Sequence, residues 1–140
     1  MEKMKDYRGS YNKMKVAFIE LTIYKNIFPL VSGYLQGYAT KFPEIKEAYD
    51  FETYTAHVQE DCDKILQDIY KINCDIYAFS CYVWNIGLIR ILTNEILNNN
   101  KDARIILGGP QVTHQGVTYL NSKYRNMIIC NGEGERVFSN

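Results

Sequence analysis

The strongest constraint on the fold is the alternation of short apolar runs with segments of helical periodicity. Five runs are predicted as strands, at residues 15–21, 48–54, 75–81, 103–108 and 127–130. The first, third and fourth are apolar almost throughout, as is typical of strands buried on both faces. Strands that alternate with helices through short connections form parallel sheets with right-handed crossovers. We therefore predict an α/β fold with a doubly wound, five-stranded parallel sheet in the order 2-1-3-4-5.

The predicted helices occupy residues 29–42, 58–72, 85–97 and 115–121. Pro29 suits the first turn of a helix, and Pro43 is expected to stop that helix. The segment 58–72 places apolar residues at three- and four-residue spacing, which gives it one apolar face. Asn85 is expected to cap the third helix. We expect residues 1–14 to form a polar leader and residues 15–140 to form one domain.

Charge and composition exclude several classes of function. Sixteen basic and sixteen acidic residues cancel, which argues against broad electrostatic binding of nucleic acid. No apolar segment is long enough for a membrane span, and the N-terminus does not resemble a secretory signal, so we expect a cytoplasmic protein. The cysteines at 62, 74, 81 and 130 form no CxxC pattern and are expected to be reduced and mostly buried. No metal site is predicted.

Ligands of doubly wound sheets bind beyond the carboxyl ends of the strands. Four loops lie there, at residues 22–28, 82–85, 108–114 and 131–135. The first loop has neither GxGxxG nor GxxxxGK[ST], so it is not a dinucleotide cradle or a P-loop. It also lacks the Ser/Thr/Gly-rich turn of flavodoxins. The third strand ends in Ser80 and Cys81 instead of the aspartate that a phosphoacceptor requires.

Two of these loops carry alternative interpretations. The rings of Tyr82 and Trp84 could wall a flat ligand, or they could pack on the neighbouring helix while Asn85 only caps it. The glycines Gly108 and Gly109 allow a positive φ and a close approach of the backbone to a ligand, or they form only a tight turn. The last of the four loops, which follows the fifth strand, contains Gly-Glu-Gly-Glu at 132–135, and its carboxylates would repel phosphate.

Taken together, residues 15–138 resemble the cobalamin-binding domain found N-terminal in cobalamin-dependent radical SAM proteins. The matching features are Pro-Leu-Val-Ser-Gly-Tyr-Leu at 29–35, Asp75, Leu-Gly-Gly-Pro at 107–110 and Gly-Glu-Gly-Glu at 132–135. Phe-Ser-Cys-Tyr-Val-Trp-Asn at 79–85 is similar to one subgroup. Ser80 and the Gly108–Gly109 pair also resemble the Ser-x-Leu…Gly-Gly pattern of cobalamin modules, with Tyr82 in place of leucine.

The resemblance implies a flavodoxin-like, Rossmann-like cobalamin-binding fold. The nucleotide tail of cobalamin would enter the sheet edge beside Ser80 and the two glycines, with the corrin over the strand ends. Together with the loop analysis, it identifies these candidate cofactor-binding residues: Thr22, Ser80, Tyr82, Trp84, Asn85, Gly108, Gly109, Pro110, Gln111, Val112, Gly132, Glu133 and Gly134.

One departure concerns the cobalt ligand. Mutases and methionine synthase carry Asp-x-His-x-x-Gly after strand one, whereas this chain has Leu-Thr-Ile-Tyr-Lys-Asn at 21–26. Ligation of cobalt by a histidine of this loop is therefore excluded, as in many radical SAM relatives. His114 is the only histidine near a ligand loop, and we expect it to be a surface or helix-capping residue and not a cobalt ligand.

The resemblance also implies a C-terminal radical SAM domain in cis. That domain would hold the 4Fe-4S cluster and S-adenosylmethionine, because the scattered thiols here cannot build a cluster. The chain ends within the helix expected after the last loop, so part of one sheet face should be bare and favour a homodimer. The alternative function is a cofactor-free domain that docks the catalytic domain or recruits substrate, with another nucleotide or flavin binder as a third possibility.

Overall fold

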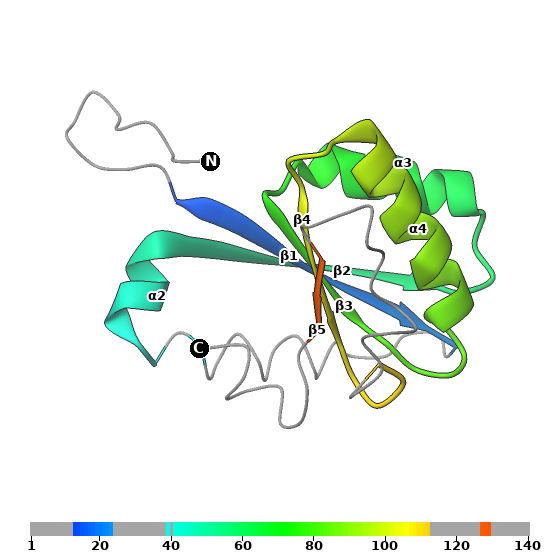
Figure 1. The fold of residues 1–140 in the computed structure, drawn as a ribbon, viewed down its shortest axis with the longest axis horizontal. Helices are drawn as coiled ribbons and strands as arrows, with labels where there is room; N and C mark the ends of the chain where they lie inside the picture. The colour runs from blue at the N-terminus through cyan, green and yellow to red at the C-terminus, as the bar shows by residue number, and fades with distance from the viewer. Residues whose placement is uncertain (1–12, 24–38, 40, 113–126, 130–140) are drawn as a thin grey trace.

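The computed structural model describes residues 13–23, 39, 41–112 and 127–129. Within them, five strands form one parallel sheet in the order β2-β1-β3-β4-β5 (Figure 1). The predicted α/β class, the parallel pairing and the strand order are confirmed. The central position of β1, β3 and β4 follows from their apolar sequences, because a strand covered on both faces has no side left for polar groups.

The strands begin and end close to the predicted positions. They are β1 (Met14–Thr22), β2 (Tyr49–His57), β3 (Ile76–Ser80), β4 (Arg104–Gly108) and β5 (Met127–Ile129). The helices are α2 (Pro43–Ala48), α3 (Cys62–Ile72) and α4 (Ile86–Asn99). Helix α3 ends at Asn73, whose φ of 53° is the left-handed conformation that asparagine tolerates at helix ends.

The sheet separates two hydrophobic clusters. On one face, Ala17, Ile19 and Leu21 of β1 pack with buried residues of α3 and α4, which both lie on this side of the sheet (Figure 1). On the opposite face, Val16 and Phe18 of β1 pack with Ile76 and Ala78 of β3 and with partly buried residues of β2 and β4. We call these the helix face and the opposite face. Alternate residues of each strand point to alternate faces, which fixes the direction of every side chain at the strand ends.

Helix α2 was not predicted. The sequence predicted only that Pro43 ends the preceding helix and that a strand begins at residue 48, whereas Pro43 is also the first residue of α2 and the strand begins at Tyr49. Proline is compatible with both positions, because the first helical turn needs no N–H from it. Helix α3 also begins later than expected, at Cys62. The predicted helices at 29–42 and 115–121 lie largely outside the described residues, and so does the loop at 131–135.

None of the helices described here is long and apolar enough to cross a membrane.

Candidate functional site

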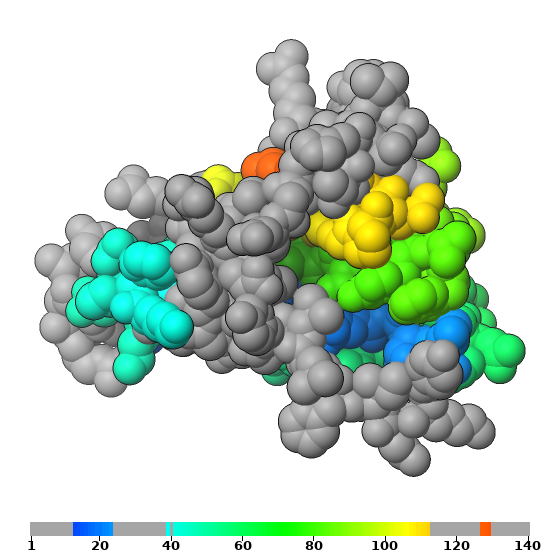
Figure 2. Space-filling view, turned by 90° about the horizontal axis from the view of Figure 1, so that it is seen from below, coloured from blue at the N-terminus to red at the C-terminus, as the bar shows by residue number. Residues whose placement is uncertain are grey.

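The carboxyl ends of β1, β3 and β4 lie next to one another at one edge of the sheet. Ser80, the last residue of β3, pairs with Gly108, the last residue of β4. Ile19 of β1 pairs with Phe79 of β3, so the next residues, Glu20 and Ser80, continue that row. Figure 2 shows the corresponding blue, green and yellow segments side by side. The loops at 82–85 and 108–112 therefore meet where the sequence predicted a ligand site.

The two sides of this edge differ in chemistry. Glu20, Ser80 and Gly108 belong to the alternate positions that point to the opposite face, where they are partly exposed. On the helix face, Cys81 and Val112 are fully buried in the hydrophobic core. A polar ligand that reaches past the strand ends would therefore meet a hydroxyl, a carboxylate and a glycine on the opposite face, and a closed apolar core on the helix face.

Asn85 closes the helix face of this edge, and its side chain does not cap α4. The side chain is only 1% exposed. Its Oδ1 accepts a 2.7 Å hydrogen bond from the Tyr82 N–H, and its Nδ2 donates to the carbonyls of Leu21 (3.0 Å) and Ser80 (2.9 Å). Asn85 occupies the N-cap position as predicted, but its side chain binds backbone at the ends of β1 and β3 instead of helix N–H groups.

The rings of Tyr82 and Trp84 stack on each other. Their centroids lie 4.5 Å apart and their planes differ by 4°. Trp84 is 44% exposed and Val83 between them is 75% exposed, so the loop presents apolar surface to solvent. Burial raises the pKa of the Tyr82 hydroxyl, and the nearby Glu20 carboxylate raises it further. The hydroxyl therefore stays protonated at physiological pH and can donate a hydrogen bond.

Gly109 provides the positive φ that the sequence predicted, with a value of 105°. A Cβ at this position would lie 2.5 Å from the carbonyl oxygen of Cys81 and 2.9 Å from its nitrogen. The Cys81 N–H donates to the Gly108 carbonyl at 2.7 Å, and the Gln111 N–H donates to the Cys81 carbonyl at 3.3 Å. The glycine is therefore required by contact between two loops of the protein itself, which favours the tight-turn interpretation for Gly109.

The remaining candidate residues are placed as follows. Pro110 is exposed and Gln111 is partly buried, in the turn beside Cys81, while the Val112 side chain belongs to the core. Thr22 is the last residue of β1, and its carbonyl accepts from the Val58 N–H at 2.9 Å. Gly132, Glu133 and Gly134 lie outside the described residues, as does His114. Cofactor contact stays a prediction for all thirteen candidates.

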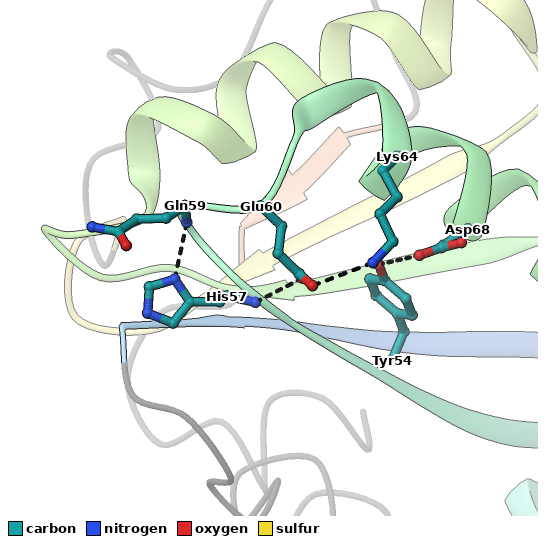
Figure 3. A network of polar contacts seen from close by, with 6 residues as sticks. All are labelled: Tyr54, His57, Gln59, Glu60, Lys64 and Asp68. Carbon is teal, nitrogen blue, oxygen red and sulfur yellow. Dashed lines mark hydrogen bonds and ion pairs between the residues drawn. The ribbon is translucent and has the colours of Figure 1, made fainter.

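A polar network at the end of β2 was not predicted from the sequence (Figure 3). His57 Nδ1 accepts from the Gln59 N–H at 3.1 Å, so the proton of the neutral ring is on Nε2, which donates to the Ile23 carbonyl at 2.8 Å. The Glu60 carboxylate accepts from the His57 N–H at 3.0 Å. This network holds the end of β1 to the end of β2. His57 therefore lies next to the first ligand loop, which corrects the expectation that His114 is the only histidine near such a loop.

The described cysteines fit reduced, structural thiols. Cys74 and Cys81 are buried and Cys62 is partly buried, all without disulfides. Burial raises the pKa of Cys74 to about 11 and that of Cys81 to about 12. No group of three His, Cys, Asp or Glu side chains within the described ranges could hold a metal ion.

The five parallel strands in the order β2-β1-β3-β4-β5 and the glycine turn after β4 define an α/β domain of the Rossmann-like class. The chain belongs to the B12-binding domain family, whose model matches residues 43–140. This confirms the family predicted from the sequence, and with it cobalamin as the cofactor that the family is named for. A search of curated proteins by sequence gave no match.

Solved structures with the same fold include OxsB, a cobalamin-dependent S-adenosylmethionine radical enzyme, with aqua-cobalamin and S-adenosylmethionine bound. The TM-score is 0.68 at 20% identity, over 88% of this chain and 17% of that chain. A cobalamin-binding protein from Desulfitobacterium hafniense DCB-2 gives a TM-score of 0.56 at 12% identity, over 84% of this chain and 53% of that one. This chain thus spans about a sixth of the length of OxsB.

Proposed function

We propose that this chain binds cobalamin at the carboxyl edge of β1, β3 and β4 and serves as the cofactor-binding module of a radical SAM enzyme. The observation that carries the proposal is the pairing of Ser80 with Gly108 at that edge, in a chain of the B12-binding family. The hydroxyl offers one hydrogen bond, and the glycine leaves the neighbouring position without a side chain. Both features suit a ligand that passes close to the backbone.

The opposite face of the sheet is the side on which we place the nucleotide tail. Ser80, Gly108 and Glu20 point there, whereas Asn85, Cys81 and Val112 fill the helix face. The corrin would then lie over the strand ends, within reach of the loop that carries Tyr82 and Trp84. An aromatic pair of this kind gains most from contact with a flat, largely apolar ligand surface.

The catalytic partner belongs to the same proposal. Bound cobalamin would supply a methyl group or another cobalt-based step to a radical SAM domain in cis, which would hold the 4Fe-4S cluster and S-adenosylmethionine. The support is the likeness to OxsB, described as a cobalamin-dependent S-adenosylmethionine radical enzyme. The residues described here bind and position the cofactor and supply no proton transfer or nucleophile of their own.

Titration with hydroxocobalamin tests the proposal directly. The visible spectrum of the corrinoid and the fluorescence of Trp84, the single tryptophan, both report binding. We expect saturable binding by the wild type and none by Gly108→Val, which places two methyl groups at the strand end. Gly87→Val is the matched control, because a Cβ at Gly87 meets no atom within 4 Å.

Circular dichroism should first establish that both variants are folded. Equal affinity of wild type and folded Gly108→Val would remove this edge as the site. Absence of binding by the wild type would instead favour the cofactor-free docking domain.

A further inference from the structure

Asn85 uses each polar atom of its side chain within the protein. A carboxamide has two N–H donors and one carbonyl oxygen, which can accept two hydrogen bonds. Both donors of Asn85 are used, on the Leu21 and Ser80 carbonyls, and the oxygen accepts from the Tyr82 N–H. These contacts also orient the amide, because the reversed assignment would put an oxygen against two carbonyls. With 1% of its surface exposed, the residue is out of reach of a ligand.

The three partners of Asn85 belong to the three segments that a ligand at this edge would meet. Leu21 ends the buried part of β1, Ser80 ends β3, and Tyr82 begins the loop that carries the stacked rings. The bond to Leu21 joins residues 64 positions apart in the sequence. The backbone of Asn85 adds two bonds, donating to the Tyr82 carbonyl at 3.2 Å and accepting from the Ile89 N–H at 2.9 Å.

We propose that Asn85 is a positioning residue of the cobalamin site, which fixes Ser80 and the Tyr82–Trp84 pair relative to the end of β1 without touching the cofactor. This inference rests on the proposed function. From the sequence, Asn85 was a candidate for direct contact with the cofactor, and this inference gives it an indirect role instead. The protein's own residues then fill the helix face at the strand ends, so the ligand binds on the opposite face.

The test variant is Asn85→Asp, which keeps the shape and the acceptor for the Tyr82 N–H but loses both donors. Its second oxygen would face the Leu21 and Ser80 carbonyls, so the buried carboxylate has an unfavourable environment and a raised pKa. Lowering the pH from 8 to 5.5 protonates such a group and restores one donor. A pH-dependent recovery of affinity therefore distinguishes positioning from a general loss of packing.

Two matched controls separate positioning from stability. Asn99→Asp makes the same chemical change at the far end of α4, where the amide donates to Tyr70 and to the Glu95 carbonyl. Thr93→Val removes the other buried polar side chain, which is 2% exposed on the same helix. Its hydroxyl bonds only within the helix, to the Arg90 carbonyl at 3.2 Å.

The measurements are the dissociation constant for hydroxocobalamin, corrected for the folded fraction, and the exchange rate of the Tyr82 amide hydrogen without ligand. We expect Asn85→Asp to weaken binding at pH 8 by at least about tenfold and to recover part of the loss at pH 5.5. Asn85→Ala, which removes the acceptor for the Tyr82 N–H, should speed the exchange of that amide hydrogen. Both controls should bind within about twofold of the wild type. Affinity of Asn85→Asp within twofold of the wild type, or an equal loss in Thr93→Val, would overturn the inference. If the wild type itself does not bind, the proposed function fails, while unchanged Tyr82 exchange in Asn85→Ala would show separately that Asn85 does not hold the loop.

Discussion

Gly109 and Cys81 approach each other so closely that no other residue fits at the glycine. A Cβ on Gly109 would lie 2.5 Å from the Cys81 carbonyl oxygen, and the φ of 105° is strained for any residue with a side chain. The contact joins the turn after β4 to the end of β3. It therefore determines how the two loops of the candidate site sit against each other.

Gly109→Ala should lower the free energy of unfolding by about 2–4 kcal/mol, through backbone strain and displacement of Cys81. Chemical denaturation measures this change. Gly87→Ala is the matched control in α4, where the added methyl group meets nothing within 4 Å. It should raise stability by about 0.5–1 kcal/mol, because glycine costs conformational entropy in a helix. Equal stability of Gly109→Ala and wild type would contradict the observed contact.

The stability of the protein should decrease at alkaline pH, in part because of Cys81. Burial raises the pKa of its thiol to about 12, from an unperturbed value of 9.0. Between these values the unfolded thiol loses its proton while the folded thiol keeps it, so the stabilising contribution is complete below pH 9 and is lost as the pH rises towards 12. Each thiol that behaves in this way makes the free energy of unfolding decrease by up to about 1.4 kcal/mol more per pH unit.

Comparison with Cys81→Ala isolates this contribution from those of the tyrosines. The variant should be less stable at pH 7, because a buried side chain is truncated, but its stability should decrease less steeply between pH 9 and 11. Cys62→Ala serves as the control, since the Cys62 thiol is only partly buried. Parallel pH profiles for wild type and Cys81→Ala would show that the Cys81 thiol ionises normally in the folded protein.

The sheet could be predicted from the sequence because its signal is local. In β1 and β3, four buried apolar residues follow one another, at 16–19 and 76–79, as is typical of strands covered on both faces. Helix α2 was missed because its six residues are too few to show a period and none of them is buried. Proline is compatible with the end of one helix and with the first turn of the next, so the local sequence did not reveal that Pro43 begins α2.

The meeting of the strand-end loops could be predicted from the sequence, but their internal contacts could not. Ser80, Gly108 and the aromatic loop follow apolar strands, and parallel strands bring their carboxyl ends to one edge. One partner of Asn85, Leu21, is distant in sequence, and so is Cys81, which contacts Gly109. A local pattern could show that asparagine suits a cap and glycine a turn, but not which backbone each one contacts.

His57 should stabilise the first ligand loop from the end of β2. His57→Phe removes the acceptor for the Gln59 N–H and the donor to the Ile23 carbonyl. Both groups then depend on water, and we expect the free energy of unfolding to decrease by about 0.5–1.5 kcal/mol. Lys64→Ala is the control in the same network, because its exposed ion pair with Glu60 should contribute less. A larger loss of unfolding free energy in Lys64→Ala than in His57→Phe would contradict the expectation that His57 contributes more to stability.

Ser80→Ala should weaken cobalamin binding without unfolding the protein. The hydroxyl lies at the end of β3 on the opposite face, beside Gly108, where it can donate one hydrogen bond to the ligand. One such bond is worth about 0.5–1.5 kcal/mol, so the dissociation constant for hydroxocobalamin should increase about 2- to 13-fold. Thr55→Ala is the control, because it removes a hydroxyl that points to the same face of the sheet but belongs to the edge strand β2. Thr55 pairs with Glu20 of β1, and β1 lies between β2 and β3. Thr55→Ala should leave the dissociation constant unchanged. A larger loss in Thr55→Ala than in Ser80→Ala would move the ligand from β3 and β4 towards the β2 edge of the sheet.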